Sequence, residues 1–212
     1  MIKTDYLIVG CGLHGSVLAE RISNVLGKKV IIIDRRDHIA GNCYSLKDAS
    51  TGIEYHKFGT HTFHTNHEKV WKYANQFTTF NCYRHQSLAR YKNKIYQLPI
   101  NLETINSFFN KNFNPDQAKR HLEKLTKPYQ KQKGFNFETK ALSQIGKELY
   151  QAFIRNYTIK HWRKDPKKLP STIFNRLPLR FNYSENYQKN CKWNGIPDDG
   201  YTNFISNILD NK

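Results

Sequence analysis

The sequence predicts an α/β fold from three features near its start. A short apolar segment at residues 6–9 (YLIV) runs into the glycine-rich turn GCGLHG at residues 10–15. Residues 16–26 then follow a helical pattern, and a second apolar segment at residues 30–33 (VIII) ends at Asp34. A strand, a helix and a second strand in this order are the components of a βαβ unit.

The glycine turn predicts that this unit binds a dinucleotide. Gly10 allows the tight turn, Gly12 lets the backbone approach a pyrophosphate, and Gly15 lets the helix pack on the strand. The phosphates would lie at the helix N-terminus, where free backbone N–H groups point at them. Asp34, 19 residues after Gly15, places a carboxylate where it can accept hydrogen bonds from an adenosine ribose. These residues alone do not determine which dinucleotide is bound.

The length of 212 residues is enough for one large or two small domains. No apolar stretch approaches the ~18–20 residues that a membrane-spanning helix needs, and the chain opens on a strand pattern, so no signal peptide is expected. The four cysteines are scattered, without a CxxC pair, and Cys11 lies inside the glycine turn. We therefore predict a cytoplasmic protein with reduced cysteines and no metal site.

The formal net charge of +17 is typical of proteins that bind nucleic acid or anionic membranes. Here the lysines are spread through the chain, with only short clusters at residues 127–133 and 163–168. No nucleic-acid-binding motif accompanies them. We expect no nucleic-acid partner and no membrane insertion, because an anionic substrate or a lysine-rich proteome explains the charge as well.

The rest of the chain predicts a hairpin, several helices and a loop. Residues 68–77 have the apolar spacing of a short helix, and residues 87–91 and 94–98 flank a Lys-Asn turn that indicates a β-hairpin. The later segments are predicted as helices from residue 102, over 115–127 and over 141–153, a charged and proline-rich loop over 164–178, a strand at 180–183 and a helix at 200–209.

Only two parallel strands are evident, at residues 6–9 and 30–33. A parallel sheet is normally buried on both faces, and two parallel strands are not a stable sheet by themselves. We therefore expect that the remaining strands are missing or that another chain supplies them.

Eight motifs, in colinear order along the whole chain, resemble those of the UDP-galactopyranose mutase family. They are GCGLHG at Gly10, DRRDHIAGN at Asp34, FGTHTFHT at Phe58, YTIKHW at Tyr157, DPKKLP at Asp165, RLPLRFNY at Arg176, ENY at Glu185 and NGIPDDGYT at Asn194. Members of the family are nearly twice as long as this chain. The resemblance therefore covers their N-terminal portion.

The resemblance implies a Rossmann-like FAD-binding domain, incomplete here, with an inserted helical domain and an antiparallel sheet layer. The implied divisions are an FAD-binding βαβ portion at 1–80, a sheet hairpin at 81–100, a helical domain at 101–165, a mobile lid and sheet segment at 166–190, and a return to the FAD-binding domain at 191–212.

The implied activity is an isomerisation without net redox change, the interconversion of UDP-galactopyranose and UDP-galactofuranose. It requires reduced FAD, whose N5 attacks the anomeric carbon of the sugar as UDP leaves. Both forms of UDP-galactose would be substrates, the product would enter cell-surface polysaccharides, and the resemblance also allows a homodimer.

Residues that match the family motifs take their expected roles from them. The expected FAD-binding residues are Gly10, Gly12, Gly15, Asp34, Arg35, Gly41, Asn42 and His61. The expected substrate-binding residues are His85, Phe153, Ile154, Tyr157, Thr158, Trp162, Arg176 and Tyr187. Arg176, which would reach the diphosphate, and His61, beside the flavin ring, are the expected catalytic residues. Without the resemblance, Phe153 would equally be a core residue and Arg176 a solvated one.

Two other interpretations remain open. An FAD-dependent oxidoreductase of the amine-oxidase type shares the glycine fingerprint, but the RLPLRFNY and GIPDDGYT segments do not belong to that class. A catalytically incomplete fragment, or a non-catalytic remnant, is favoured by the missing strands. A second phosphate-binding arginine would also belong to the absent half.

Overall fold

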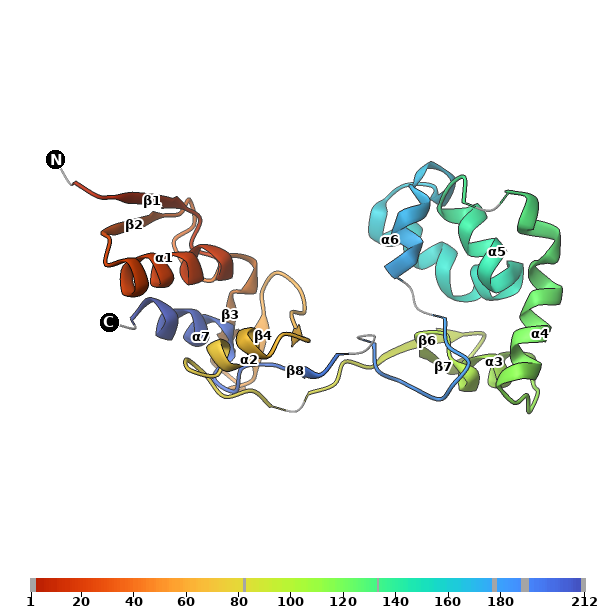
Figure 1. The fold of residues 1–212 in the computed structure, drawn as a ribbon. Coiled ribbons are helices and arrows are strands. Elements are labelled where there is room, and N and C mark those ends of the chain that lie inside the picture. Colours follow the sequence, from red (N-terminus) through yellow and green to blue (C-terminus); the bar gives the residue numbers. More distant parts are fainter. Residues whose placement is uncertain (1–2, 82, 133, 177–178, 188–190, 211–212) are drawn as a thin grey trace. The chain divides into compact units, whose positions relative to one another are not determined.

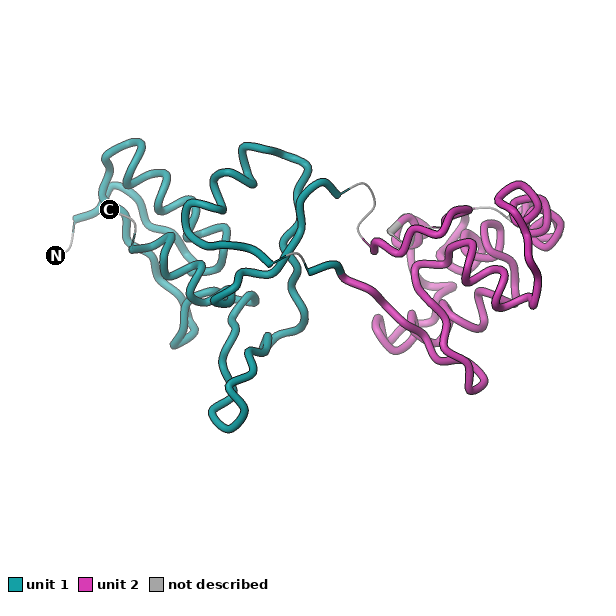
Figure 2. Tube along the Cα trace, turned by 90° about the horizontal axis from the view of Figure 1, so that it is seen from below, with its two compact units in different colours: residues 1–84, 190–212 teal, residues 85–189 magenta. Residues whose placement is uncertain are grey.

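The computed structural model describes residues 3–81, 83–132, 134–176, 179–187 and 191–210. The chain forms two compact units, coloured separately in Figure 2. Unit 1 consists of residues 1–84 and 190–212, and unit 2 of residues 85–189. Each unit has a hydrophobic core of its own.

Unit 1 begins with the predicted βαβ unit. Strands β1 (Tyr6–Val9) and β2 (Val30–Ile33) pair in parallel, with Tyr6 opposite Val30 and Val9 opposite Ile33. Helix α1 (Leu13–Leu26) connects them and lies along one side of the pair (Figure 1). It ends at Gly27, whose φ of 62° is the left-handed conformation that glycine adopts at little cost. The strands and the helix are therefore confirmed.

The remaining elements of unit 1 come from both ends of the chain. A 3-10 turn, η1 (Gly41–Cys43), leads to the antiparallel pair β3 (Ser45–Lys47) and β4 (Glu54–His56). Strand β5 (Phe63–Thr65) pairs with the distant β8 (Trp193–Gly195), and α2 (Glu68–Ala74) follows β5. Helix α7 (Gly200–Leu209) packs against α1 and buries Tyr201, Phe204 and Ile208.

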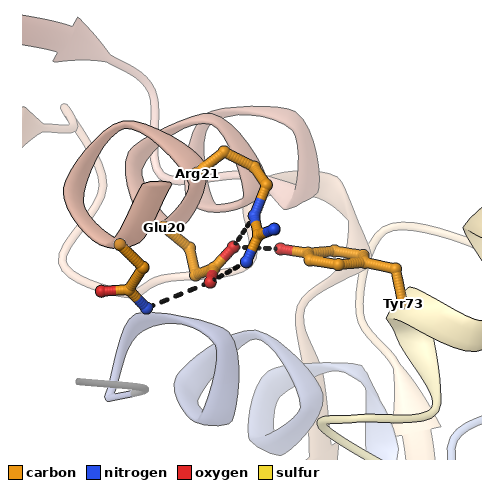
Figure 3. Close-up of polar contacts among 4 residues, drawn as sticks. Glu20, Arg21 and Tyr73 are labelled. Carbon is orange, nitrogen blue, oxygen red and sulfur yellow. Dashed lines mark hydrogen bonds and ion pairs between the residues drawn. The ribbon is translucent and has the colours of Figure 1, made fainter. Parts of the chain in front are cut away.

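A buried carboxylate ties α1 to α2 (Figure 3). The Glu20 side chain is inaccessible to solvent and forms an ion pair with Arg21. It accepts a hydrogen bond from the Tyr73 hydroxyl at 2.7 Å and one from the Asn24 amide at 3.1 Å. The Arg21 contact, followed by these two donors, lowers the pKa of Glu20 to about 2 against the opposing effect of burial. Glu20 is therefore ionised at neutral pH.

Unit 2 begins with the predicted hairpin. Strands β6 (Ser87–Tyr91) and β7 (Lys94–Leu98) pair antiparallel with Tyr91 opposite Lys94. Lys92 and Asn93 both have positive φ, as the commonest two-residue hairpin turn requires. Three helices follow, each begun by an asparagine that caps its first turn. They are α3 (Leu102–Phe109), α4 (Pro115–Thr126) and α5 (Phe137–Leu149).

Short helical segments complete unit 2. They are η2 (Lys127–Gln132), the π-helix η3 (Tyr150–Arg155), α6 (Asn156–Trp162), η4 (Pro166–Lys168) and η5 (Ser171–Arg176). Helix α5 carries Ala141, Ile145 and Leu149 at the predicted spacing, and all three are buried in the core of this unit. The core is closed by α3, α4 and β7.

Two predictions of local structure were wrong. The helix over residues 141–153 is interrupted at Gly146, whose φ of 75° and ψ of 171° are not helical, and continues as the π-helix. Residues 180–183 form no strand. The Arg180 backbone N–H donates to the Ile100 carbonyl, and the Leu102 N–H donates to the Asn182 carbonyl. These two hydrogen bonds follow neither the parallel nor the antiparallel pattern of a β-ladder, so residues 180–183 have irregular structure.

Candidate functional site

In the glycine turn of unit 1, the backbone geometry requires glycine at two positions, Gly10 and Gly15, but not at Gly12. Gly10 has a φ of 107°, and its N–H donates to the Ile33 carbonyl at 2.7 Å. A Cβ on Gly15 would lie 2.0 Å from the Gly10 carbonyl oxygen, so only glycine fits there. Gly12 has a φ of −84°, and a Cβ there would meet nothing closer than Gly41 Cα at 3.9 Å. Backbone geometry alone therefore does not require glycine at position 12. Because Gly12 has no side chain, open space remains at the N-terminus of α1, and we call this space the cradle.

A second loop lies against this turn. The Ala40 N–H donates to the Cys11 carbonyl at 2.8 Å. Gly41 has a φ of 54°, and a Cβ on it would come within 3.0 Å of Gly12 Cα. Beyond it, the Asn42 side-chain oxygen accepts a hydrogen bond at 2.8 Å from Arg36. The predicted cofactor residues Gly12, Gly41 and Asn42 therefore lie on two adjoining loops.

Asp34 joins the glycine turn to the end of β2. Its carboxylate oxygens accept backbone hydrogen bonds from Arg36 at 2.9 Å and Cys11 at 2.7 Å. These two bonds, that of Arg36 first, hold the pKa of Asp34 below its ordinary value, so the group stays ionised. A carboxylate has about four lone-pair positions, which leaves capacity for a ribose hydroxyl. Its neighbour Arg35 is exposed.

His61 lies in a small aromatic cluster just before β5. Its backbone N–H donates to the His56 Nδ1 atom at 3.0 Å, and its own Nδ1 lies 2.8 Å from the Gly59 carbonyl. Burial, and then the proximity of His61, lowers the pKa of His56, so His56 is neutral at pH 7. The ring of the buried Tyr201 lies within 6.3 Å of both imidazoles, and burial raises the pKa of its hydroxyl.

Unit 2 contains a cavity of about 710 Å³. Five of the predicted substrate-binding residues line it, namely His85, Phe153, Ile154, Tyr157 and Tyr187. They come from three separate segments: His85 two residues before β6, the η3–α6 region and the loop that precedes residue 188. The rings of His85 and Tyr187 meet edge to face at 5.3 Å. The fold therefore brings together side chains that are up to 102 residues apart in the sequence.

The π-helix supplies the apolar wall of this cavity. Phe153 and Ile154 lie in η3, and Tyr157 follows in the first turn of α6. Phe153 is 5% exposed and contacts Tyr96 with ring centroids 5.1 Å apart, so it is also a core residue. Tyr157 is 58% exposed, and its ring stacks on His161 at 5.7 Å. An exposed, pre-stacked aromatic ring beside an apolar wall suits a flat ligand ring.

Two other predicted substrate residues, Thr158 and Trp162, are not among the described residues that line the cavity. Thr158 is buried at 2% exposure, and Trp162 is 40% exposed at the end of α6. The backbone of Arg176 ends η5, and its side chain lies outside the described part of the chain. The roles of these three residues stay predictions.

Sequence reasoning missed three polar residues of the cavity wall, Ser87, Arg90 and Lys160. Ser87 is within 3.2 Å of His85 Nε2. Lys160 follows Tyr157 by three residues, which places the two on one helix face and is the signal that could have identified it. Arg90 and Lys160 give the wall positive charge, which suits an anionic ligand.

Among the described residues, every helix is too short or too polar to span a lipid bilayer. The same residues include no group of three or more His, Cys, Asp or Glu side chains placed to hold a metal ion.

Comparisons with known proteins agree with the description of the glycine turn in unit 1 and of the cavity in unit 2. Residues 8–77 match the family model of the NAD(P)-binding Rossmann-like domain, and residues 152–212 match that of UDP-galactopyranose mutase. Over its full length the chain is 44% identical to a probable UDP-galactopyranose mutase from Klebsiella pneumoniae, of which it covers 54%. It is 39% identical over 208 residues to a dTDP-fucopyranose mutase from Escherichia coli, of which it covers 53%.

Solved structures share the fold. A crystal structure of reduced UDP-galactopyranose mutase matches 99% of this chain with a TM-score of 0.71 at 17% identity, and the match covers 47% of that chain. Cyclohexylamine oxidase from Brevibacterium oxydans matches 99% of this chain and 49% of its own with a TM-score of 0.57 at 14% identity. The chain spans about half the length of the curated relatives it matches. By these matches, the chain is similar over its whole length to about half of a UDP-galactopyranose mutase.

Proposed function

We propose that this chain carries the FAD-binding loops and the UDP-binding cavity of an enzyme that interconverts UDP-galactopyranose and UDP-galactofuranose. The observation that carries the proposal is the cavity of unit 2, because five of the residues predicted to bind substrate line it from three chain segments. The full-length similarity to the Klebsiella pneumoniae relative supports the same assignment.

Unit 1 has the groups that FAD would need. The open cradle at Gly12 leaves room for a pyrophosphate beside the N-terminus of α1, and Asp34 offers an ionised acceptor to a ribose. Arg35, Gly41, Asn42 and His61 would complete the cofactor contacts, with His61 beside the flavin ring. When bound, reduced FAD supplies the nucleophile N5 for the anomeric carbon.

Unit 2 would bind and orient the nucleotide. Phe153 and Ile154 form an apolar wall for the uracil, and Tyr157 offers its exposed ring for stacking. Lys160 would attract the diphosphate, as would the predicted Arg176. His85 and Tyr187, which pack edge to face, would donate to sugar or phosphate oxygens. Thr158 and Trp162 would support this wall from α6.

A second candidate acts on a different nucleotide sugar. The Escherichia coli relative, a dTDP-fucopyranose mutase, is 39% identical to this chain. Thymine carries one methyl group more than uracil, so the apolar wall at Phe153 and Ile154 would decide between the two bases. The similarity to Cyclohexylamine oxidase is a likeness of fold alone at 14% identity, and favours no oxidase reaction. A cytoplasmic location, a homodimer and a catalytically incomplete chain stay predictions.

The proposal is tested by titrating the 212-residue chain with UDP and with dTDP in a calorimeter. We expect UDP to bind, and Tyr157→Ala to weaken it about tenfold, since loss of one stacked ring costs about 1–2 kcal/mol. The matched control is Tyr183→Ala, because Tyr183 is 62% exposed in the same unit but does not line the cavity. Tighter binding of dTDP would favour the second candidate. Equal effects of the two substitutions, or no nucleotide binding by the parent chain, would contradict the proposal.

A further inference from the structure

The fold brings together the two short lysine clusters that lie apart in the sequence. Tyr129 belongs to the cluster at residues 127–133 and Lys167 to the cluster at residues 163–168. Both residues line a smaller cavity of unit 2, with a volume of about 310 Å³. The rest of its wall comes from α5, η3 and Asp165.

The segment that forms this cavity is strongly positive. Residues 127–168 contain eleven lysines and arginines but three acidic residues, which gives a net charge of +8 against +17 for the whole chain. Lys147, Arg155 and Lys167 line the cavity, which we call the basic cavity. The two ion pairs formed by described residues both lie in unit 1, so none of these three cations is paired with a carboxylate. An anionic ligand would relieve their mutual repulsion.

The two carboxylates in the wall of the basic cavity already accept hydrogen bonds from the protein. Glu138 accepts one from the Tyr150 hydroxyl at 2.9 Å. Burial, followed by this contact, raises the pKa of Tyr150, so the hydroxyl stays protonated and remains a donor. Asp165 accepts one from the backbone N–H of Lys167 at 2.9 Å. Both carboxylates therefore have a structural role within unit 2.

The cationic side chains, by contrast, have donors to spare. Within the described part of the chain, the ammonium groups of Lys147 and Lys167 have no hydrogen-bond partner, and Arg155 donates only to the Asn156 side chain at 3.3 Å. An ammonium group carries three N–H donors and a guanidinium group five. Several such donors around one hollow suit a phosphate group, whose oxygens accept charge-assisted hydrogen bonds.

The basic cavity is separate from the cavity proposed for the nucleotide. The two cavities have no lining residue in common. Within η3, Phe153 and Ile154 line the nucleotide cavity, whereas Gln151 and Arg155 line the basic cavity. The π-helix therefore presents different residues to each cavity, and an anion at Arg155 would not occupy the place of the nucleotide.

We propose that the basic cavity is a binding site for a phosphate group, carried by a small molecule or by a lipid headgroup. Lys147, Arg155 and Lys167 would donate hydrogen bonds to the phosphate oxygens. The neighbouring lysines of the two clusters would attract the anion and speed its association. The proposal does not depend on the proposed nucleotide-sugar chemistry, because it uses neither the glycine turn nor the nucleotide cavity.

The test titrates the 212-residue chain with inorganic phosphate in a calorimeter at low ionic strength. We expect binding, with slower amide exchange at residues 147–155. Lys147→Gln and Lys167→Gln should each weaken binding about tenfold, because each removes one charge-assisted donor. Circular dichroism checks that both variants fold.

Two further variants control for charge and for place. Lys119→Gln removes the same charge from an exposed lysine of α4 that does not line the cavity, and Lys160→Gln removes it from the nucleotide cavity. Each should leave the phosphate affinity within about twofold of the parent value. Weakening by Lys160→Gln but not by Lys147→Gln would overturn the proposal, since the phosphate would then lie in the nucleotide cavity.

A second experiment identifies the source of the phosphate group. The chain and its variants are sedimented with phosphatidylcholine vesicles that contain phosphatidic acid. Cosedimentation that Lys147→Gln abolishes and Lys119→Gln preserves would assign the cavity to a lipid headgroup, whereas binding of inorganic phosphate without cosedimentation would assign it to a small molecule. The proposal is wrong if neither probe binds, or if Lys147→Gln and Lys119→Gln weaken binding equally.

Discussion

At the scale of single residues, the glycine turn contains glycines that the fold itself requires and one glycine that the fold does not require. Gly10 and Gly15 are fixed by the chain itself, through a positive φ at the first and a carbonyl 2.0 Å from any Cβ at the second. Gly12 has room for a side chain and an ordinary φ. We propose that this position has no side chain because a pyrophosphate approaches the N-terminus of α1 there.

Glu20 leads to a prediction on stability and pH. The folded-state pKa of about 2 lies below the ordinary value of 4.5, so Glu20 stabilises unit 1 above pH 4.5 and this contribution is lost as pH falls toward 2. Glu20→Gln should therefore lower the free energy of unfolding at pH 7 by about 1–2 kcal/mol, a modest value because Arg21 is half exposed. The difference from the parent should shrink between pH 4.5 and pH 2, as measured by urea unfolding.

The control for this prediction is Glu68→Gln. Glu68 forms an ion pair with Lys72 at 2.9 Å, and both side chains are exposed. Such a pair contributes little, so the substitution should change stability by less than about 0.5 kcal/mol at any pH. A Glu20→Gln loss that stayed constant down to pH 2 would show that packing, and not the charge, is the source of the effect.

The sequence predicted candidate residues where a local motif contains them, as GCGLHG contains the glycines, DRRDHIAGN contains Asp34 and YTIKHW contains Tyr157. Phe153 lies outside these motifs, and its expected role came from the family resemblance. Arg90 and Lys160 were missed because a cavity wall is made by segments distant in sequence, and a lysine in a lysine-rich chain gives no signal by itself. The hydrogen bonds of Asp34 to the backbone of Cys11 and Arg36 likewise depend on folding.

At the scale of elements, the local sequence pattern predicted the elements that are formed by contacts between residues close together in the sequence. The hairpin of β6 and β7 was confirmed with its turn, because two residues with positive φ close it. The pairing of β5 with β8 places His64 opposite Asn194, 130 residues later in the sequence, and no local pattern encodes such a partner. Residues 180–183 were wrongly predicted as a strand, because Phe181 packs against the core of unit 2 without regular backbone pairing, whereas Tyr183 is exposed.

The interruption of α5 gives a prediction at this scale. Gly146 has a φ of 75° and a ψ of 171°, a region nearly restricted to glycine, and a Cβ there would lie 3.3 Å from Leu125 Cβ. We expect Gly146→Ala to lower the free energy of unfolding of unit 2 by about 2–3 kcal/mol, from backbone strain and from displacement of α4. Urea unfolding monitored by far-ultraviolet circular dichroism measures the change.

Gly134→Ala is the matched control, because Gly134 has a φ of 88° in the same unit but open space around its Cβ position. It should cost about 1–2 kcal/mol from backbone strain alone. Equal losses for the two variants would show that the contact with Leu125 has no energetic effect. A loss at Gly146 below that at Gly134 would contradict the idea that the interruption of α5 is fixed by its backbone conformation.

At the scale of the whole molecule, the two units have separate cores and separate candidate sites. Unit 1 holds the glycine turn, Asp34 and His61, and unit 2 holds the cavity. A ligand that binds only the folded form of one unit stabilises that unit by about 2.7 kcal/mol at a hundred times its dissociation constant. Thermal unfolding with each ligand is therefore able to assign each site to its unit.

We expect FAD to raise the unfolding temperature of unit 1, and UDP that of unit 2, each by about 10 °C at this excess. Hydrogen exchange read by mass spectrometry distinguishes the units, since slower exchange should appear in residues 8–42 with FAD and in residues 150–160 with UDP. Gly12→Ala should abolish the FAD effect alone, because the new methyl group occupies the cradle while the chain itself tolerates it. Tyr157→Ala should reduce the UDP effect alone. An FAD effect that survives Gly12→Ala would place the cofactor elsewhere, and a UDP effect in unit 1 would remove the cavity of unit 2 as the nucleotide site.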